Sequence, residues 1–274
     1  MNMFTSFRNA NSFRSSSPLS DDQIMRVAPS IFAEDKHGSR SERYTVIPTI
    51  TVLNALRKEG FRPFMVCQTR SRDEDKRGHA KHMLRLRHEN QIASQQANEI
   101  VLLNSHDGSS SYQMIAGVFR FVCSNGMVVG DIAEDVRVRH SGNVVDNVIE
   151  GAFRVLDDFE LIDQHRENMQ SVILKPEEQK VFANAALQLK YDTSTEPAPI
   201  TDTDILRIRR RDDDQNDLWT TFNRIQENLI RGGIRSRTKD GKVSTTREVK
   251  GIDQNVKLNR ALWTLAEGMR NLKA

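Results

Sequence analysis

The sequence predicts an α+β protein in which helices pack on a central, mostly antiparallel sheet, followed by a helical, basic C-terminal part. Between residues 61 and 123, short apolar or alternating runs are separated by polar or glycine-containing turns, which is typical of antiparallel strands. Before and after this stretch, apolar residues recur at helical spacing. The chain has 274 residues, of which 37% are apolar, so it can bury one large core or two smaller ones.

Two helices are predicted ahead of the sheet. Ser20 is a typical N-cap residue, and two aspartates follow it in the first turn, where the helix dipole favours negative charge. This helix should end before Pro29, because proline disfavours helical geometry in the residue that precedes it. A second helix is predicted over residues 49–59, with Gly60 just past its end.

The strands are predicted from apolar runs bounded by turn residues. They cover residues 61–69, 80–88, 99–105 and 111–123. A further strand is predicted over residues 134–143, because Val136 and Val138 alternate with arginines.

The remaining chain is predicted to be mainly helical. A helix of about five to seven turns should start after Gly142, and another should start at Pro176. Later helices are expected near residues 215–231 and 253–271. We therefore divide the chain into a flexible tail (1–19), an α+β core domain (20–192), a linker or loop (193–203) and a helical basic region (204–274).

Composition says more about the cellular compartment of the protein than about its function. The 40 basic and 37 acidic residues nearly cancel, so any case for a polyanionic partner depends on local clusters. The two cysteines, Cys67 and Cys123, are too few for a disulfide framework and fit a reducing compartment. No apolar run approaches the roughly 18 residues that a membrane span needs. A cytoplasmic protein without membrane contact is expected. No Rossmann or phosphate-loop motif is present, and no cofactor is expected.

The first basic cluster lies on a predicted strand. Lys81, Met83, Arg85 and Arg87 alternate along it and should share one face. Residues 70–88 carry seven basic and three acidic side chains. Such a stripe is suited to a phosphate backbone, and the alternative is a solvated face balanced by the adjacent loop.

The second basic cluster lies near the C-terminus. Residues 231–250 carry seven basic and two acidic side chains, and the dipeptide at 240–241, Asp-Gly, predicts a two-residue hairpin turn. That turn would pair Lys239 with Lys242, Arg237 with Ser244 and Arg235 with Thr246. The alternative is a flexible basic loop.

Two neighbouring features favour structural roles. In residues 207–219, four arginines are followed closely by aspartates, which indicates a charged turn whose charges neutralise one another. Trp219 with Phe222, and Trp263 with Leu265, have helical spacings typical of core contacts, with a base-stacking platform as the alternative.

Catalytic and metal sites are only weakly supported. His106 and Asp107, with His79, His82 or His88, offer metal-ligand types, but two histidines at the ends of one strand lie roughly 20 Å apart. Residues 105–107 list the members of a Ser-His-Asp triad, yet adjacent side chains of an extended chain point in alternating directions. We expect residues 107–108 to form the turn between two core strands instead. No catalytic residue or metal ligand is assigned.

The segment from residue 104 to 127 carries a resemblance. NSHDGSSSYQ followed by GVFRFVCSNGM is similar to the motif of a phage/plasmid-like family of unknown function, numbered 932, with members of the YfjQ/YafZ type. The resemblance covers residue 20 to the C-terminus. Its motif residues here are Asn104, Ser105, His106, Asp107, Gly108, Arg120, Cys123 and Asn125.

The resemblance implies an accessory protein of a prophage or plasmid and brings no established reaction. Divergent members commonly have threonine at position 126 with a helix following, whereas Asn125-Gly126 here is compatible with a turn. His106, Arg120 and Asn125 are expected to form a polar cluster at one end of the sheet, with Cys123 packed inside.

The leading functional hypothesis is nucleic-acid binding without strong sequence preference, including single-strand binding or annealing of DNA. The expected contact residues are Lys81, Arg85, Arg87, Arg235, Arg237, Lys239 and Lys242. Two alternatives stay open: a metal-dependent hydrolase or nuclease that uses His106 and Asp107, and a protein without chemistry that binds a host factor. A homo-oligomer is compatible with each of these.

Overall fold

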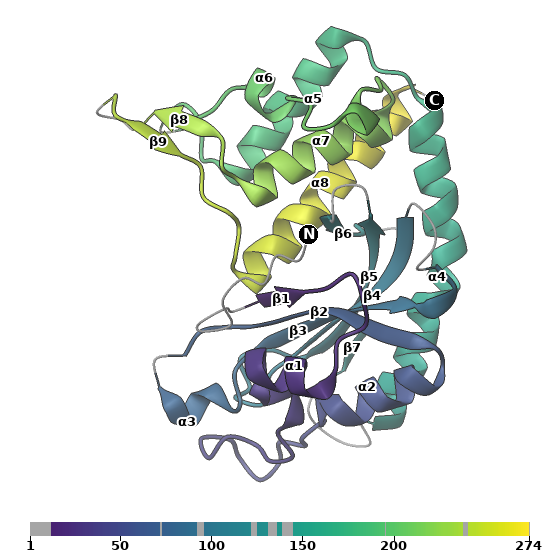
Figure 1. Ribbon diagram of the computed structural model, residues 1–274, viewed down its shortest axis with the longest axis vertical. Helices are drawn as coiled ribbons and strands as arrows, with labels where there is room; N and C mark the ends of the chain where they lie inside the picture. The colour runs from purple at the N-terminus through teal and green to yellow at the C-terminus, as the bar shows by residue number, and fades with distance from the viewer. Residues whose placement is uncertain are drawn as a thin grey trace. The chain divides into compact units, whose positions relative to one another are not determined.

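The chain folds into two compact units. The computed structural model describes residues 12–71, 73–91, 96–121, 125–130, 136–138, 145–194, 196–237 and 241–273 (Figure 1). The first unit comprises Met1–Phe121 with Ala133–Phe159, and the second comprises Val122–Ile132 with Glu160–Ala274. The division falls inside a long helix, and residues 193–203, which the sequence suggested as a linker, lie within the second unit.

An antiparallel sheet is the centre of the first unit, as the sequence predicts. Its strands are β1 (Ser12–Arg14), β2 (Phe61–Gln68), β3 (His82–His88), β4 (Gln96–Asn104) and β5 (Tyr112–Arg120), hydrogen-bonded in that order. A short strand, β7 (Val136–Val138), pairs with the start of β5. The α+β class is therefore confirmed. β1 comes from a segment that was expected to be a flexible tail, whereas residues 1–11 lie outside the described residues.

Helices α1 (Asp21–Val27) and α2 (Thr49–Lys58) pack on one side of the sheet (Figure 1). Ser20 caps α1 in a reciprocal capping box with Gln23, and α1 ends before Pro29, as predicted. Gly60 follows α2 with φ +84°, a conformation that favours glycine. The shorter helical segments of this unit are η1 (Pro29–Phe32), α3 (Glu74–Arg77) and η2 (Glu89–Gln91).

Helix α4 (Val145–Ser171) is longer than its apolar pattern indicates, because it continues nine residues past the last predicted apolar position, Ile162. The second unit contains its C-terminal half. It also contains β6 (Asn125–Val128), α5 (Pro176–Lys190), α6 (Asp202–Ile205), η3 (Arg211–Asp213), α7 (Leu218–Arg231) and α8 (Ile252–Lys273). Within the described ranges, no helix is long and apolar enough to cross a membrane.

Aromatic side chains form the centre of the second unit. Trp219 and Phe222 of α7 contact Trp263 of α8 edge to face, each with a centroid separation of 5.9 Å. All three side chains are at most 1% exposed. The prediction that the two tryptophans belong to the core is confirmed, and neither is accessible to a nucleic-acid base.

A separate two-stranded hairpin follows α7. It consists of β8 (Arg235–Arg237) and β9 (Val243–Thr245), and its yellow-green ribbon extends from the end of α7 (Figure 1). The predicted hairpin exists, but the predicted register is wrong by one residue, because Arg235 pairs with Thr245 and Arg237 with Val243. Five residues therefore connect the strands instead of two.

Candidate functional site

The family motif begins at the turn between β4 and β5. Residues 105–111 connect the two strands and include Asp107 and Gly108, the residues predicted for the turn; Gly108 has φ +73°. The Asp107 carboxylate accepts a hydrogen bond from the backbone N–H of Ser109 at 2.9 Å, and the Ser105 hydroxyl accepts one from that of Ser110 at 2.9 Å. Burial alone would raise the pKa of Asp107, but hydrogen bonds from Ser109 and Ser105 lower it. The motif's polar side chains thus stabilise the turn itself.

A buried hydrogen-bonded chain lies beside the turn and is centred on His82. The Ser30 hydroxyl donates to Gln68 Oε1 at 2.7 Å, so the contact of 2.7 Å between Ser30 Oγ and His82 Nδ1 requires the proton on Nδ1. His82 Nε2 then accepts from the Thr49 hydroxyl at 2.8 Å, and Thr49 in turn accepts from Asn104 Nδ2 at 2.9 Å. We call this set of five side chains the His82 network.

Burial keeps the centre of this network neutral. His82 is fully buried, and desolvation, followed by the nearby His106, lowers its pKa to about 3. Both ring nitrogens are engaged by hydroxyl groups. A neutral imidazole with both nitrogens occupied and no exposed surface is suited to holding helix and strand together, and not to proton transfer with a substrate.

The backbone of the motif also holds two loops. The N–H of His106 donates to the carbonyl of His79 at 2.9 Å. The carbonyl of His106 accepts from the N–H of His37 at 3.1 Å. The hydroxyl of Tyr44 donates to the carbonyl of Ser105 at 2.9 Å. Burial, with the negative charge of Asp107, raises the pKa of Tyr44 to about 12. These contacts make the motif the anchor of the segment between α1 and α2.

The histidines do not assemble the metal site considered as an alternative. The rings of His82 and His106 are neighbours, with centroids 5.6 Å apart, but His82 is committed to its hydroxyl partners. His88 lies at the other end of β3. In the part of the chain that the structure describes, no group of three or more histidine, cysteine or acidic residues is arranged to hold a metal ion.

The expected polar cluster of His106, Arg120 and Asn125 does not form. Arg120 ends β5 opposite Gln96, at the other end of the β4–β5 pair from the motif turn. Seven residue steps along β4 separate the two ends, roughly 23 Å. Asn125 and Gly126 begin strand β6 and are not a turn. Cys123 lies outside the described residues.

The basic stripe on β3 is not exposed. Arg85 and Arg87 are 2% and 1% exposed, so the expectation that these two side chains face solvent is wrong. The reason is Glu99 on β4, which is fully buried and accepts from Arg85 Nε at 2.5 Å and from Arg87 Nε at 2.8 Å. Lys81 is half-buried just before the strand, and its carbonyl accepts from the N–H of Thr69.

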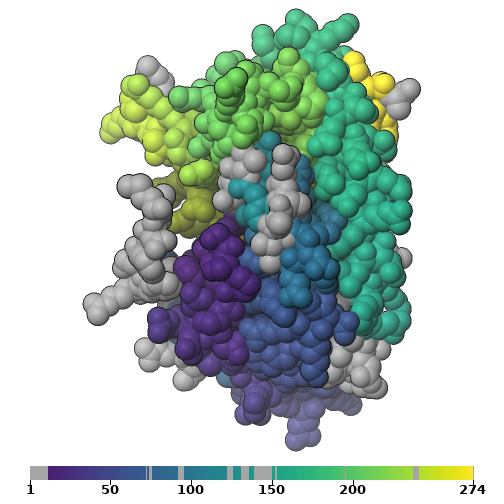
Figure 2. All heavy atoms as spheres, turned by 45° about the vertical axis from the view of Figure 1, so that its right-hand side comes forward, coloured from purple at the N-terminus to yellow at the C-terminus, as the bar shows by residue number. Residues whose placement is uncertain are grey.

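Unlike the stripe on β3, the hairpin region carries exposed cations. Arg235 and Lys242 are exposed, Arg237 lies in β8, and Lys239 falls outside the described residues. Figure 2 shows the yellow-green atoms of this region at the surface. Across the described chain Arg235 and Arg247 have no ion-pair partner, whereas Arg231 pairs with Glu227. Arg235 and Arg237 belong to strand β8, Lys242 lies in the connection just before β9, and Arg247 follows β9.

Glycines fix the base of the hairpin. Gly232 has φ +65°, and a Cβ there would lie 2.7 Å from the backbone of Thr246 and Arg247. The N–H of Gly233 donates to the carbonyl of Thr246 at 2.8 Å, and the N–H of Thr246 donates to the carbonyl of Ile234 at 2.8 Å. The ribbon is therefore tied to the end of α7 by its backbone.

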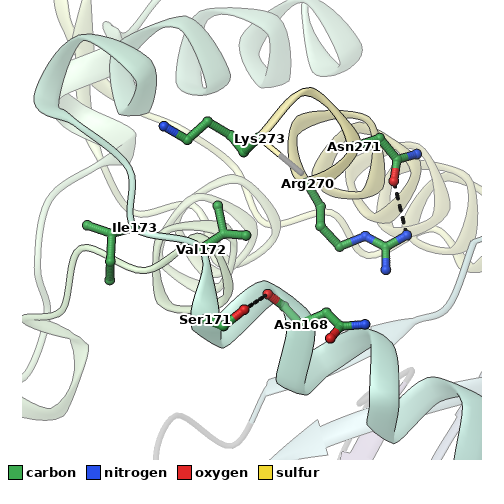
Figure 3. A pocket seen from close by; sticks show the side chains of 7 residues that line it. All are labelled: Asn168, Ser171, Val172, Ile173, Arg270, Asn271 and Lys273. Carbon is green, nitrogen blue, oxygen red and sulfur yellow. Dashed lines mark hydrogen bonds between the residues drawn. The ribbon is translucent and has the colours of Figure 1, made fainter.

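A pocket of about 610 Å³ lies between the C-terminal ends of α4 and α8 (Figure 3). Two cations line it, Arg270 and Lys273. Arg270 pairs with Glu267 at 2.9 Å, and Lys273 pairs with Glu178 at 2.9 Å. Both cations that line this pocket are therefore balanced by glutamates.

Several residues of these sites were not identified from the sequence. Ser30, Thr49, Gln68 and Tyr44 come from distant parts of the chain, and their sequence neighbourhoods show no sign of a shared network. Glu99 did leave a signal, because it is the lone acidic residue in the apolar run of β4. A buried strand position occupied by an acid indicates a buried cationic partner.

Comparison with known proteins places the chain in a family. The family model described as "Domain of unknown function (DUF932)" matches residues 36–263, so the chain belongs to the DUF932 family. It is 54% identical to the UPF0380 protein YafZ of Escherichia coli (strain K12) over 263 residues, which is 96% of each chain. It is also 54% identical to the UPF0380 protein YfjQ of the same strain over 261 residues, 95% of each chain. No solved structure matches it.

Proposed function

We propose that the protein binds nucleic acid without strong sequence preference and that the β8–β9 hairpin is its main contact surface. The observation that carries the proposal is the exposed two-stranded ribbon whose segment, residues 231–250, has seven basic and two acidic side chains. Cations on such a ribbon can follow phosphate groups, which give affinity but no sequence information.

The contact residues differ from the full sequence-based set. Arg235, Arg237, Lys239 and Lys242 stay in the proposal, and exposed Arg247 joins them on the segment after β9. We exclude Arg85 and Arg87 from the contact residues, because their guanidinium groups are buried against Glu99. Lys81 is a secondary candidate.

The proposal includes a biological setting. The family resemblance implies an accessory protein of a prophage or plasmid, and such a protein would meet DNA in the cytoplasm during recombination or transfer. Single-strand binding or annealing is one form of this activity. The exposed ribbon is compatible with it, since phosphate contacts are available on single strands and duplexes alike.

Binding to labelled DNA tests the proposal. We expect the full chain to bind single strands and duplexes of unrelated sequence at low salt, with the logarithm of the affinity falling linearly with the logarithm of the salt concentration. The variant Arg235→Gln/Arg237→Gln/Lys242→Gln should bind every sequence more weakly. It should also lower the salt slope by about 2 to 3, one unit for each lost phosphate contact.

A charge-matched control separates this surface from net charge. Arg26→Gln/Arg43→Gln/Lys58→Gln removes three exposed cations of the first unit and should retain the affinity and salt slope of the unmodified chain. The proposal fails if the unmodified protein does not bind DNA at low salt. It also fails if the hairpin and control variants bind equally well.

A further inference from the structure

A second group of arginines gathers at the base of the hairpin. Arg207, Arg209, Arg210 and Arg231 all lie around two adjacent residues of α7, Glu227 and Asn228. Arg210 and Arg231 pair with the Glu227 carboxylate at 2.7 and 3.2 Å. Asn228 accepts from Arg209 Nε at 2.6 Å and donates to the carbonyl of Arg207 at 3.0 Å. We call these four arginines the hairpin-base cluster.

The charges of the hairpin-base cluster do not balance. Arg210 donates hydrogen bonds to both carboxylate oxygens of Glu227. It also pairs with the carboxylate of Asp213 at 2.7 Å. Arg231 shares the same Glu227 oxygen. Arg207 and Arg209 have no carboxylate partner within the described ranges. The segment expected to be a self-neutralising turn therefore neutralises only one of its arginines in this cluster, and four cations share two acidic groups.

Arg209 connects the hairpin-base cluster to the hairpin. Its Nη2 donates to the carbonyl of Gly232 at 3.1 Å, at the residue where the chain leaves α7 for β8. Burial is the largest cause of its lowered pKa; Glu227 opposes this, while Arg231, Arg210 and Arg207 lower it further. Three other guanidinium groups thus lie close enough to repel it, and an added anion would relieve this repulsion.

We propose that the hairpin-base cluster binds phosphate groups of the same nucleic acid, through Arg207, Arg209 and Arg231, as a second row of contacts beside the hairpin. This inference rests on the proposed function and extends it. Arg207, Arg209 and Arg231 are exposed, and planar guanidinium groups suit the oxygens of a phosphodiester. Arg210, tied to two carboxylates, holds the cluster in place.

The salt dependence of DNA binding tests this second row. In the full chain, Arg207→Gln/Arg231→Gln leaves Arg209 to position Gly232 and removes two exposed charges. The salt slope should fall by about 2, and affinity should weaken several-fold for every sequence. The charge-retaining variant Arg207→Lys/Arg231→Lys should keep a salt slope close to that of the unmodified chain, and thermal unfolding should show that both variants are folded.

The outcomes separate the two proposals. If the unmodified chain does not bind DNA, the proposed function fails and this inference with it. If the chain binds and the hairpin variant weakens binding, but Arg207→Gln/Arg231→Gln keeps the full salt slope, only the inference is overturned. The inference is also overturned if inorganic phosphate binds the unmodified chain at low millimolar concentration and not this variant while DNA binding is unaffected, because the cluster would then serve free anions.

Discussion

Glu99 Oε1 lies 2.8 Å from Arg87 Nε, and both side chains are buried in the sheet. The other carboxylate oxygen accepts from Arg85, so one acid serves two arginines. The guanidinium carbon of Arg87 also lies 3.3 Å from the ring centroid of Phe119, an aromatic contact that partly replaces lost hydration. Burial would raise the pKa of Glu99, but the two arginines hold it below its ordinary value.

Glu99→Gln should therefore destabilise the protein strongly. The substitution removes the negative charge and leaves two buried arginines facing each other, and breaking a buried ion pair costs about 3–5 kcal/mol. The change in the free energy of unfolding can be measured by urea denaturation. Glu150→Gln is the control, since its pair with Arg154 is exposed and should contribute less than about 1 kcal/mol. Equal stability of the two variants would show that the buried charge is compensated elsewhere.

The neutral His82 predicts acid sensitivity. Its pKa is about 3 in the folded chain and about 6.5 when unfolded, so the unfolded state binds more protons between these values. This contribution to stability is complete above pH 6.5 and is lost as the pH falls toward 3, by at most about 1.4 kcal/mol per pH unit. Urea denaturation at pH 7 and pH 5 measures it.

His82→Gln removes the titrating group and should reduce the difference in stability between pH 7 and pH 5, although it lowers stability at both. His88→Gln, at the other end of β3, is the matched histidine control and should retain the difference. If His82→Gln and the unmodified protein lost the same free energy between the two pH values, His82 would not be the group responsible.

Asn104 tests whether the family motif is a scaffold. Its Nδ2 donates to the Ile47 carbonyl at 3.1 Å and to the Thr49 hydroxyl, and its Oδ1 accepts from the N–H of Ser105. Asn104→Ala removes these three hydrogen bonds, so that the Ile47 carbonyl and the Ser105 N–H lose this partner while Thr49 keeps its bond to His82, and should cost about 2–4 kcal/mol of unfolding free energy. Asn184→Ala, exposed on α5, should change stability by less than about 0.5 kcal/mol. A stable Asn104→Ala variant would show that Asn104 does not hold the motif in place.

Features coded by neighbouring residues could be predicted from the sequence. Ser20 caps its helix through Gln23, three residues away, and Gly60 follows α2 in a conformation that its own backbone permits. The motif turn at Asp107-Gly108 is equally local. Such elements depend on side chain to backbone contacts within a few positions, which a sequence pattern shows directly.

Features coded by distant residues could not be predicted. His82 bonds to Ser30, 52 positions away, and the burial of Arg85 depends on Glu99 in the next strand. A charged residue alternating along a strand gives the same pattern whether it meets water or a buried acid. The hairpin register failed for a different reason: a two-residue turn at Asp240-Gly241 was assumed, whereas the strands are joined by five residues.

Gly232 controls how firmly the hairpin is held, and its neighbour provides the control. Both Gly232 and Gly233 have positive φ, at +65° and +75°, so alanine adds backbone strain at either position. Only at Gly232 would the new Cβ also meet backbone, 2.7 Å from Thr246 and Arg247, whereas nothing lies within 4 Å at Gly233. The neighbouring backbone cannot rotate away as a flexible side chain can.

Gly232→Ala should therefore cost more than Gly233→Ala, by about 1–3 kcal/mol, because overpacking against fixed atoms forces the chain to shift. Hydrogen exchange at the amide of Thr246, which bonds to the carbonyl of Ile234, should accelerate more in the Gly232 variant. DNA affinity should fall in parallel, since a displaced ribbon no longer aligns its cations with successive phosphates. Equal exchange rates in the two alanine variants would mean that the base of the hairpin adapts freely, and the ribbon would then act as a flexible basic arm.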